Sequence, residues 1–213
     1  MRSERTRTFT EQARRRQIVD GALEVIAEQG YPQASLARIA EHIGIAKSAV
    51  LYHFTSKSEV VAAVFTEIFT LGAAVIVPAV NAETSAAAKL SAYIRANVAF
   101  VAANRSAAVA MLELISGYRD ADGLRVDQAA AKAVQEHPPT GDLAALDPQS
   151  IFSEGVDNGE FRELSPLLMK NILRGALDSA AQEYARDPGY DVTGHGEALV
   201  EIFEKATARA AKS

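Results

Sequence analysis

The sequence contains no cysteine and no tryptophan among its 213 residues, and only seven prolines. Without cysteine, disulfides, thiolate nucleophiles and cysteine-ligated zinc sites are excluded. Alternating runs of β-branched residues, which indicate strands, are scarce. The first residues are charged and lack the apolar core of a signal peptide. The longest uncharged run, between Glu67 and Glu83, is about 15 residues and contains Pro78, whereas a membrane span needs roughly 20. We therefore expect a cytoplasmic protein with no membrane association.

Motifs of catalysis and of metal or nucleotide binding are also missing. The sequence holds no Gly-x-Ser-x-Gly, no Gly-x-Gly-x-x-Gly and no P-loop. His42, His137 and His195 stand far apart, without the spacing of metal ligands. We therefore expect no metal, no cofactor and no enzymatic activity. The rival hypothesis is an enzyme that uses Glu113 as a base in a C-terminal cavity, but no second catalytic group accompanies it.

The charge of the chain is unevenly distributed. Hydrophobic residues make up an ordinary 48%, and the formal net charge is −5. Residues 1–60 carry nine Lys and Arg against seven Asp and Glu, whereas residues 61–213 carry 13 against 20. A mildly basic segment on an acidic remainder is typical of a small nucleic-acid-binding module attached to another domain.

Apolar residues recur at helical spacing, and we predict an all-α protein of about nine helices. Gly30 and Gly44 are placed to end the first two helices, Ser35 and Ser56 to cap the second and fourth, and Pro78 to end the fourth. The predicted helices are 10–29, 35–43, 46–54, 56–77, 85–104, 106–118, 148–158, 165–186 and 195–210, with a loop region at 120–148 that contains Pro138-Pro139.

Two of these helices, 35–43 and 46–54, are short and joined by the turn Gly44-Ile45-Ala46, which is the arrangement of a helix-turn-helix. In such a pair the second helix lies in the major groove of B-DNA, which admits one α-helix. Helix 46–54 has an apolar side with Val50 and Phe54, and polar or short side chains elsewhere. The pattern predicts a DNA-binding module.

The predicted DNA contacts come from both helices and from the start of the next one. Lys47 and Ser48 lie in the first turn of the second helix, which reaches base edges, and Tyr52 and His53 end it with donors for phosphates or bases. Lys57, at a helix N-terminus, is predicted to bind a phosphate. The full set is Ser35, Arg38, Lys47, Ser48, Ala49, Tyr52, His53 and Lys57. Arg14, Arg15 and Arg16 are either a solvated helix face, further phosphate contacts, or residues that direct an N-terminal arm into the minor groove.

The run Gly-Ile-Ala-Lys-Ser-Ala-Val-Leu-Tyr-His-Phe-Thr-Ser-Lys-Ser-Glu, residues 44–59, resembles the recognition-helix signature of the tetracycline-repressor (TetR) family. The preceding helices resemble the same family's first two, so the resemblance covers residues 13–62. Ala46 stands where a Ser or Thr cap is common, Ala49 replaces a frequent Thr, and Thr55 replaces a frequent Pro. The resemblance implies a three-helix DNA-binding head at 1–57 and a helical domain at 58–213 that binds an effector and dimerises.

One stripe in the C-terminal part fits an effector cavity, since Tyr93, Asn97, Phe100 and Asn104 recur at i, i+4, i+7 and i+11. The alternative is ordinary packing in which the amides are satisfied locally. Glu113 pairs either with a cationic ligand or with an arginine such as Arg105, and we favour the arginine. The predicted effector residues are Phe69, Tyr93, Asn97, Phe100, Asn104, Met111, Glu113 and Tyr118.

The last two predicted helices carry small and apolar residues at helical spacing, which is typical of a four-helix interface between two subunits. The predicted interface residues are Gly175, Ala176, Ser179, Leu199, Ile202 and Phe203, with packing inside one monomer as the alternative. The turn at residues 159–162 resembles one that often precedes the dimerisation helices in the family.

The combined prediction is a homodimeric transcriptional regulator that binds double-stranded DNA. The most specific form is a repressor that a small-molecule effector releases from a palindromic operator. Two alternatives stay open at this point, namely a helix-turn-helix regulator without an effector, and an activator.

Overall fold

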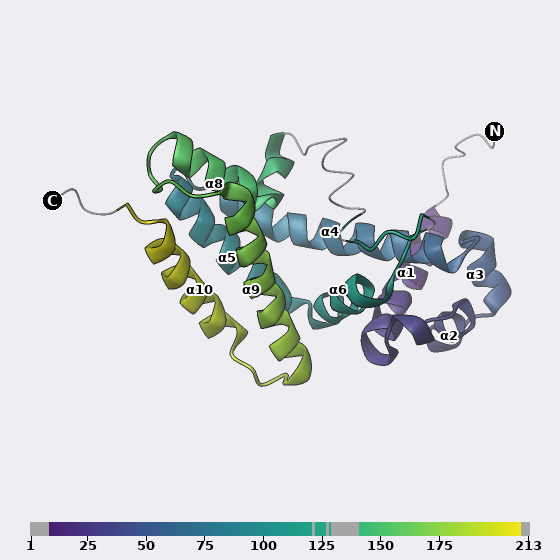
Figure 1. Cartoon of the computed structure of the whole chain (residues 1–213). Coiled ribbons are helices and arrows are strands. Elements are labelled where there is room, and N and C mark those ends of the chain that lie inside the picture. The colour runs from purple at the N-terminus through teal and green to yellow at the C-terminus, as the bar shows by residue number, and fades with distance from the viewer. Residues whose placement is uncertain (1–8, 121, 127, 129–140, 210–213) are drawn as a thin grey trace.

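The computed structural model describes residues 9–120, 122–126, 128 and 141–209, and it confirms an all-helical chain (Figure 1). The described part contains nine α-helices and two 3-10 helices, and its one extended pairing is an isolated bridge between Arg119 and Arg125. A head that contains two short helices lies at one end, a bundle lies at the other, and one long helix joins them (Figure 1). The predicted loop at Pro138-Pro139 lies outside the described residues.

The head contains α1 (Phe9–Gln29), a 3-10 turn (Tyr31–Gln33), α2 (Leu36–His42) and α3 (Lys47–His53). These bounds lie within a residue or so of the predicted ones because local signals set them. Gly30 and Gly44 adopt φ of +82° and +69°, which L-residues rarely reach, so each ends its helix there. The Ser35 hydroxyl accepts the backbone N–H of Arg38 at 3.2 Å and caps α2.

The long helix α4 (Lys57–Asn81) starts at the predicted cap, where the Ser56 hydroxyl accepts the N–H of Glu59. The prediction that Pro78 ends it is wrong, because the helix continues to Asn81. Pro78 lies in the last turn, where a missing N–H costs one hydrogen bond and the ring's fixed φ still fits a helix. Its own carbonyl accepts the N–H of Ala82 at 3.1 Å.

The same helix meets the length and composition of a membrane span, as core helices of globular proteins also do. Its apolarity has a structural reason, because α4 contributes to two separate cores. Val60 and Val64 are buried in the head, and Ile76 and Val80 are buried in the bundle.

The bundle contains α5 (Ala86–Ala103), α6 (Arg105–Gly117), a 3-10 helix (Gly141–Leu146), α8 (Pro148–Asp157), α9 (Pro166–Arg186) and α10 (Val192–Thr207). The helices α5 and α6 meet at Asn104 with a bend of 102°. The predicted start of the last helix at His195 is three residues late, because Asp191 caps it by accepting the N–H of Gly194 at 2.8 Å.

The head core does not consist of the first four helices alone. Ala107, Ala110 and Leu114 of α6 are buried in the same cluster as residues of α1, α3 and α4. The domain boundary after residue 57 stays a prediction. It falls at the first residue of α4, whose early turns pack within the head.

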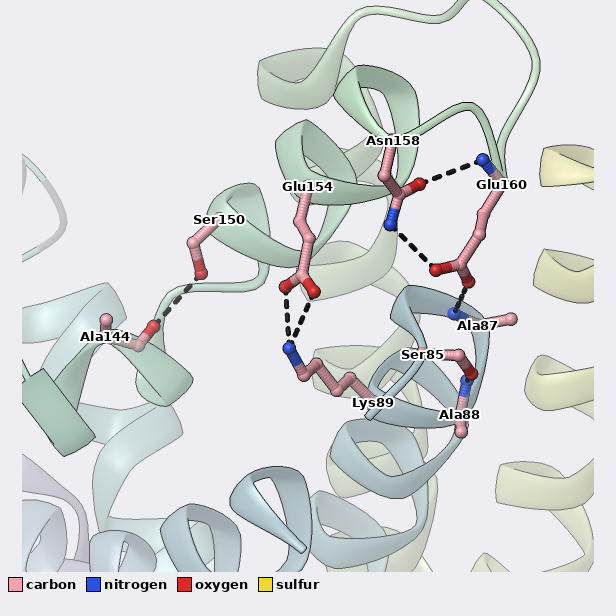
Figure 2. Close-up of polar contacts among 9 residues, drawn as sticks. All are labelled: Ser85, Ala87, Ala88, Lys89, Ala144, Ser150, Glu154, Asn158 and Glu160. Carbon is pink, nitrogen blue, oxygen red and sulfur yellow. Dashed lines mark hydrogen bonds and ion pairs between the residues drawn. The ribbon is translucent and has the colours of Figure 1, made fainter. Parts of the chain in front are cut away.

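A polar clasp joins α8 and the turn after it to the N-terminus of α5 (Figure 2). The Glu160 carboxylate accepts the backbone N–H of Ala87 at 3.2 Å and the Asn158 amide at 2.8 Å. Slight burial raises the pKa of Glu160, but the helix N–H groups outweigh it and hold that pKa below its usual value. Lys89 and Glu154 add an ion pair at 2.7 Å. The turn at 159–162 thereby fixes the start of α5.

Replacing either of two helix glycines by alanine is expected to change the stability of the protein, with opposite signs. A Cβ on Gly155 of α8 would lie 2.2 Å from the buried Phe161 ring, whereas a Cβ on Gly72 of α4 would meet only Ile76, at 3.9 Å. We expect Gly155→Ala to destabilise the protein by about 1–3 kcal/mol through overpacking. Gly72→Ala should stabilise it by up to about 1 kcal/mol, because alanine is the better helix former.

Urea unfolding of both variants at one protein concentration measures the two effects. An unchanged midpoint for Gly155→Ala would show that Phe161 moves aside at no cost, and would contradict the packing described for α8.

Candidate functional site

The helix α3 presents a polar face to solvent. Val50 and the residue that follows the helix, Phe54, are fully buried in the head core and fix how α3 is rotated. Lys47, Ser48 and Tyr52 are consequently exposed, with 74% of Tyr52 accessible. The structure thus brings three of the predicted DNA contacts together on one solvent-exposed surface, which is accessible to a DNA groove.

The start of α3 lacks a capping side chain, as the sequence indicated. Ala46 occupies the cap position in an extended conformation and makes no side-chain hydrogen bond to the helix. Ala49, one turn along, is half-buried. These short side chains leave the first turn of α3 uncrowded, which is what close approach to base edges requires.

The predicted contacts on α2 already have partners within the head. The Ser35 oxygen accepts the N–H of Arg38, which leaves its hydroxyl proton to donate elsewhere. The Arg38 guanidinium donates to Glu41 at 2.9 Å, and both side chains are exposed. Because an exposed ion pair of this kind is weak, a phosphate is able to compete for Arg38.

Arg15 turns out to be a structural residue of the head. Its guanidinium lies 3.8 Å from the centre of the Phe54 ring and donates to the His53 carbonyl oxygen at 2.7 Å. It also pairs with Glu59 at 3.3 Å. Slight burial raises the pKa of Glu59, but hydrogen bonds from Thr55 and Arg15 together hold it below its usual value. Arg15 thus attaches α1 to the end of α3, whereas Arg14 and Arg16 stay exposed.

Lys57, the predicted phosphate contact, is half-buried at the start of α4. Its ammonium donates to the Tyr31 carbonyl oxygen at 2.6 Å and lies 4.0 Å from the centre of that ring. Burial lowers the pKa of the Lys57 ammonium. Lys57 thus also contacts the head, and its contact with a phosphate stays a prediction.

The last turn of α3 carries Tyr52 and His53, the two aromatic residues predicted to contact DNA. The rings of Tyr52 and His53 meet edge to face at 5.0 Å, and the Tyr52 hydroxyl donates to Glu11 at 3.3 Å. The His53 side chain is half-buried, so Tyr52 is the more accessible of the two.

The end of α6 lies directly on the head. Tyr118 meets Tyr31 edge to face at 5.7 Å and Phe65 of α4 at 6.0 Å. A Cβ on Gly117 would approach the Tyr31 ring to 3.2 Å, so glycine allows this contact without a shift of the ring. Tyr118, predicted as an effector residue, therefore occupies the junction between the head and the bundle.

Glu113 belongs to the same junction and does not pair with Arg105 as predicted. Its carboxylate lies beside Gly30, at 3.1 Å from the position a Cβ would take there. Arg105 instead donates to the carbonyl oxygens of Tyr184 and Ala185 at 3.4 and 2.7 Å. The two side chains are separated because Arg105 begins α6 and Glu113 lies eight residues later, about 12 Å along the same helix.

The amides on the α5 stripe follow the alternative that the sequence left open. Asn97 donates to the carbonyl oxygen of Tyr93 at 2.7 Å, and Asn104 donates to that of Phe100 at 3.0 Å. Both amides are thus satisfied within their own helix. Tyr93 is buried in the bundle, where burial raises the pKa of its hydroxyl.

The predicted effector residues divide between the two cores and the surface. Phe100, Met111 and Tyr118 pack against the head core, Tyr93 belongs to the bundle core, and Phe69 of α4 is 55% exposed. A groove of about 730 Å³ lies instead between α4, α5 and α10, lined largely by alanines with Ser91, Arg95 and Glu204. Sequence reasoning missed it, although alanines repeat along residues 87–99.

The predicted dimer residues divide into two groups. Leu199 and Phe203 are buried in the bundle of their own chain, which is the alternative considered for them, so they are not available to a partner. Gly175, Ser179 and Ile202 are exposed, and Ala176 is half-buried. Sequence reasoning also missed the exposed apolar residues of α9, which are Leu167, Leu168 and Ile172.

Comparison with known proteins identifies the head. Residues 18–64 match the family model described as bacterial regulatory proteins, tetR family. This segment includes the turn between α2 and α3 and the exposed face of α3.

Similarity also extends across the bundle. The fatty acid metabolism regulator protein of Bacillus subtilis (strain 168) is 26% identical over 190 residues, which cover 88% of this chain and 92% of that protein. The structure of the fatty acid degradation regulator FadR from Bacillus halodurans is 25% identical, with a TM-score of 0.70 over 89% of this chain and 93% of that one.

A third relative carries a ligand in its structure. The transcriptional regulator FadR from Bacillus subtilis, solved in complex with stearoyl-CoA, superposes with a TM-score of 0.70 at 23% identity, over 88% of this chain and 96% of that one. The helix-turn-helix geometry, the family match over the head and the likeness along the bundle all agree. The head is therefore that of a TetR-family transcriptional regulator, and the chain as a whole is FadR-like in its fold.

Proposed function

We propose that this regulator is a repressor that binds a palindromic operator as a homodimer and leaves it when a fatty acyl-CoA binds. One observation carries the DNA-binding part, namely the exposed polar face of α3 on a helix held in place by its buried side. In a two-fold dimer each α3 enters a major groove, and the half-sites lie one helical turn, about 34–36 Å, or a multiple of it apart.

The dimer is proposed to form through α9 and α10. Leu168, Ile172, Gly175 and Ser179 are exposed on α9, and Ile202 is exposed on α10. An exposed apolar surface of this kind indicates an interaction site. It lies on the helices farthest along the chain from the head, which leaves α3 accessible (Figure 1).

The effector proposal rests on the relative that holds stearoyl-CoA. The contact of Tyr118 with Tyr31 supplies a route by which movement of α6 reaches the head. An effector shifts operator affinity only by as much as its own affinity differs between the two states.

A second candidate, a regulator without an effector, is favoured by a different observation. Tyr93, Phe100 and Met111, which were predicted to line a cavity, are packed against the two cores instead. The effector experiment below distinguishes the two candidates.

Selection from random duplex DNA at a fixed salt concentration tests DNA recognition. We expect a palindrome.

Lys47→Ala should then relax the base preference at one position by about 1–3 kcal/mol, because a base contact is lost. Tyr52→Phe should weaken binding to all sequences alike by about 0.5–1.5 kcal/mol, because one hydrogen bond to the backbone is lost.

Competition binding on single-base operator variants separates the two substitutions. The assignment of α3 to base recognition fails if Lys47→Ala binds every operator variant with the ranking of the unmodified protein.

A charge placed in the proposed interface tests the dimer. Ile172→Asp should shift the protein towards monomers, because an unpaired carboxylate would be buried between the subunits. Leu143→Asp is the matched control, since Leu143 has the same exposure, 52% against 51%, but lies in the 3-10 helix. Sedimentation velocity over a range of concentrations measures both, and a dimer that survives in Ile172→Asp would place the interface elsewhere.

Stearoyl-CoA, with coenzyme A alone as the control, tests the effector. We expect the acyl-CoA to weaken operator binding by about 5–150-fold, which is the usual range of allosteric coupling. The measurement is operator affinity by fluorescence anisotropy, with the thermal midpoint of the protein recorded in parallel. Neither a change in affinity nor a shift in midpoint at saturating ligand would favour the regulator without an effector.

A further inference from the structure

Leu51 is a large apolar side chain on the solvent face of α3. It is 45% exposed, although the residue before it, Val50, is fully buried. Burying apolar surface stabilises a folded protein by about 25 cal/mol per Å². A single exposed leucine is common on protein surfaces, but this one lies in the middle of the helix that carries the proposed DNA contacts.

The position of Leu51 on the helix places it among the proposed DNA contacts. Residues three and four apart share a face of an α-helix. Leu51 follows Ser48 by three positions and Lys47 by four, and Tyr52 is next to it at the outermost edge. The side chain thus stands within the polar face, between the residues at both ends of α3.

The proposed dimer interface does not account for this exposure. Leu168, Ile172 and Ile202 lie on α9 and α10, whereas α3 lies at the opposite end of the molecule (Figure 1). Leu51 is also not part of the head core that buries Val50.

The two alanines of this segment precede Leu51 by five and two positions, so they lie on other sides of the helix. Ala46 is exposed at the start of α3, and Ala49 is half-buried. Because an alanine ends at Cβ, Leu51 projects farther from the helix axis than either. If α3 lies in the major groove, the leucine methyl groups come nearest to the floor of the groove among its apolar groups.

The floor of the major groove offers one apolar group, which is the C5-methyl of thymine. We propose that Leu51 contacts a thymine methyl in each half-site and thereby makes the protein prefer a T·A pair there. This inference rests on the proposed operator recognition by α3 and adds a specificity-determining residue to it.

The experiment removes the methyl group from DNA rather than from the protein. Each thymine of the selected operator is replaced in turn by deoxyuridine, symmetrically in both half-sites, and the Kd is measured for the unmodified protein and for Leu51→Ala. For one symmetric pair of thymines the unmodified protein should lose about fourfold in affinity per half-site, or about 15-fold in total, which corresponds to one methylene-sized apolar contact. Leu51→Ala should not respond to deoxyuridine at that pair.

Two variants serve as controls for the fold and for nonspecific effects. Alanine is the best helix former, so Leu51→Ala should keep the thermal midpoint of the unmodified protein. Leu143→Ala removes a side chain of similar exposure far along the chain from α3, and it should reproduce the deoxyuridine profile of the unmodified protein.

Each other outcome overturns the inference. If both proteins lose the same affinity at every thymine, another residue contacts the methyl groups. If neither protein responds to deoxyuridine while Leu51→Ala binds all sequences more weakly, Leu51 contacts the sugar-phosphate backbone only. If the unmodified protein selects no sequence at all, operator recognition itself fails, and that result is visible before any substitution is made.

Discussion

The structure depends on one helix that belongs to two hydrophobic cores. Val60 and Val64 of α4 are buried in the head, and Ile76 and Val80 of the same helix are buried in the bundle. A packed helix moves as a rigid element, since protein interiors transmit strain rather than absorb it. The head is thus attached to the bundle by a stiff connection, and a rearrangement around the end of α4 changes the orientation of α3.

A second connection limits how the head can move. Leu114 of α6 is fully buried in the head core, and Tyr118 stacks edge to face on Tyr31. The Lys57 ammonium donates to the carbonyl oxygen of Tyr31 and lies over the Tyr31 ring. The loop between α1 and α2 is therefore contacted by the first residue of α4 and by the end of α6, so both routes from the bundle converge next to the DNA-binding helices.

The sequence predicted the head well and the bundle less well, for a physical reason. Gly30, Gly44, Ser35 and Ser56 act within a few residues of themselves, so their effect on helix ends can be read locally. Periodicity also identified the buried side of α3. The failures depend on contacts between distant residues.

Those failures share one cause. The sequence pattern identifies the apolar face of a helix, but it does not show which other part of the molecule packs against that face. Leu199 and Phe203 have the spacing of an interface but pack inside their own chain. Arg105 has a carboxylate nearby in sequence, yet it bonds to carbonyls 79 and 80 residues away.

Because α4 is part of both hydrophobic cores, its length is constrained. Each residue of an α-helix adds 1.5 Å and 100° of rotation. Because both ends of α4 are embedded, inserting or deleting one residue between Val64 and Ile76 would turn one core against the other by more than a quarter of a circle, so the number of residues in that stretch is fixed even where the side chains are exposed.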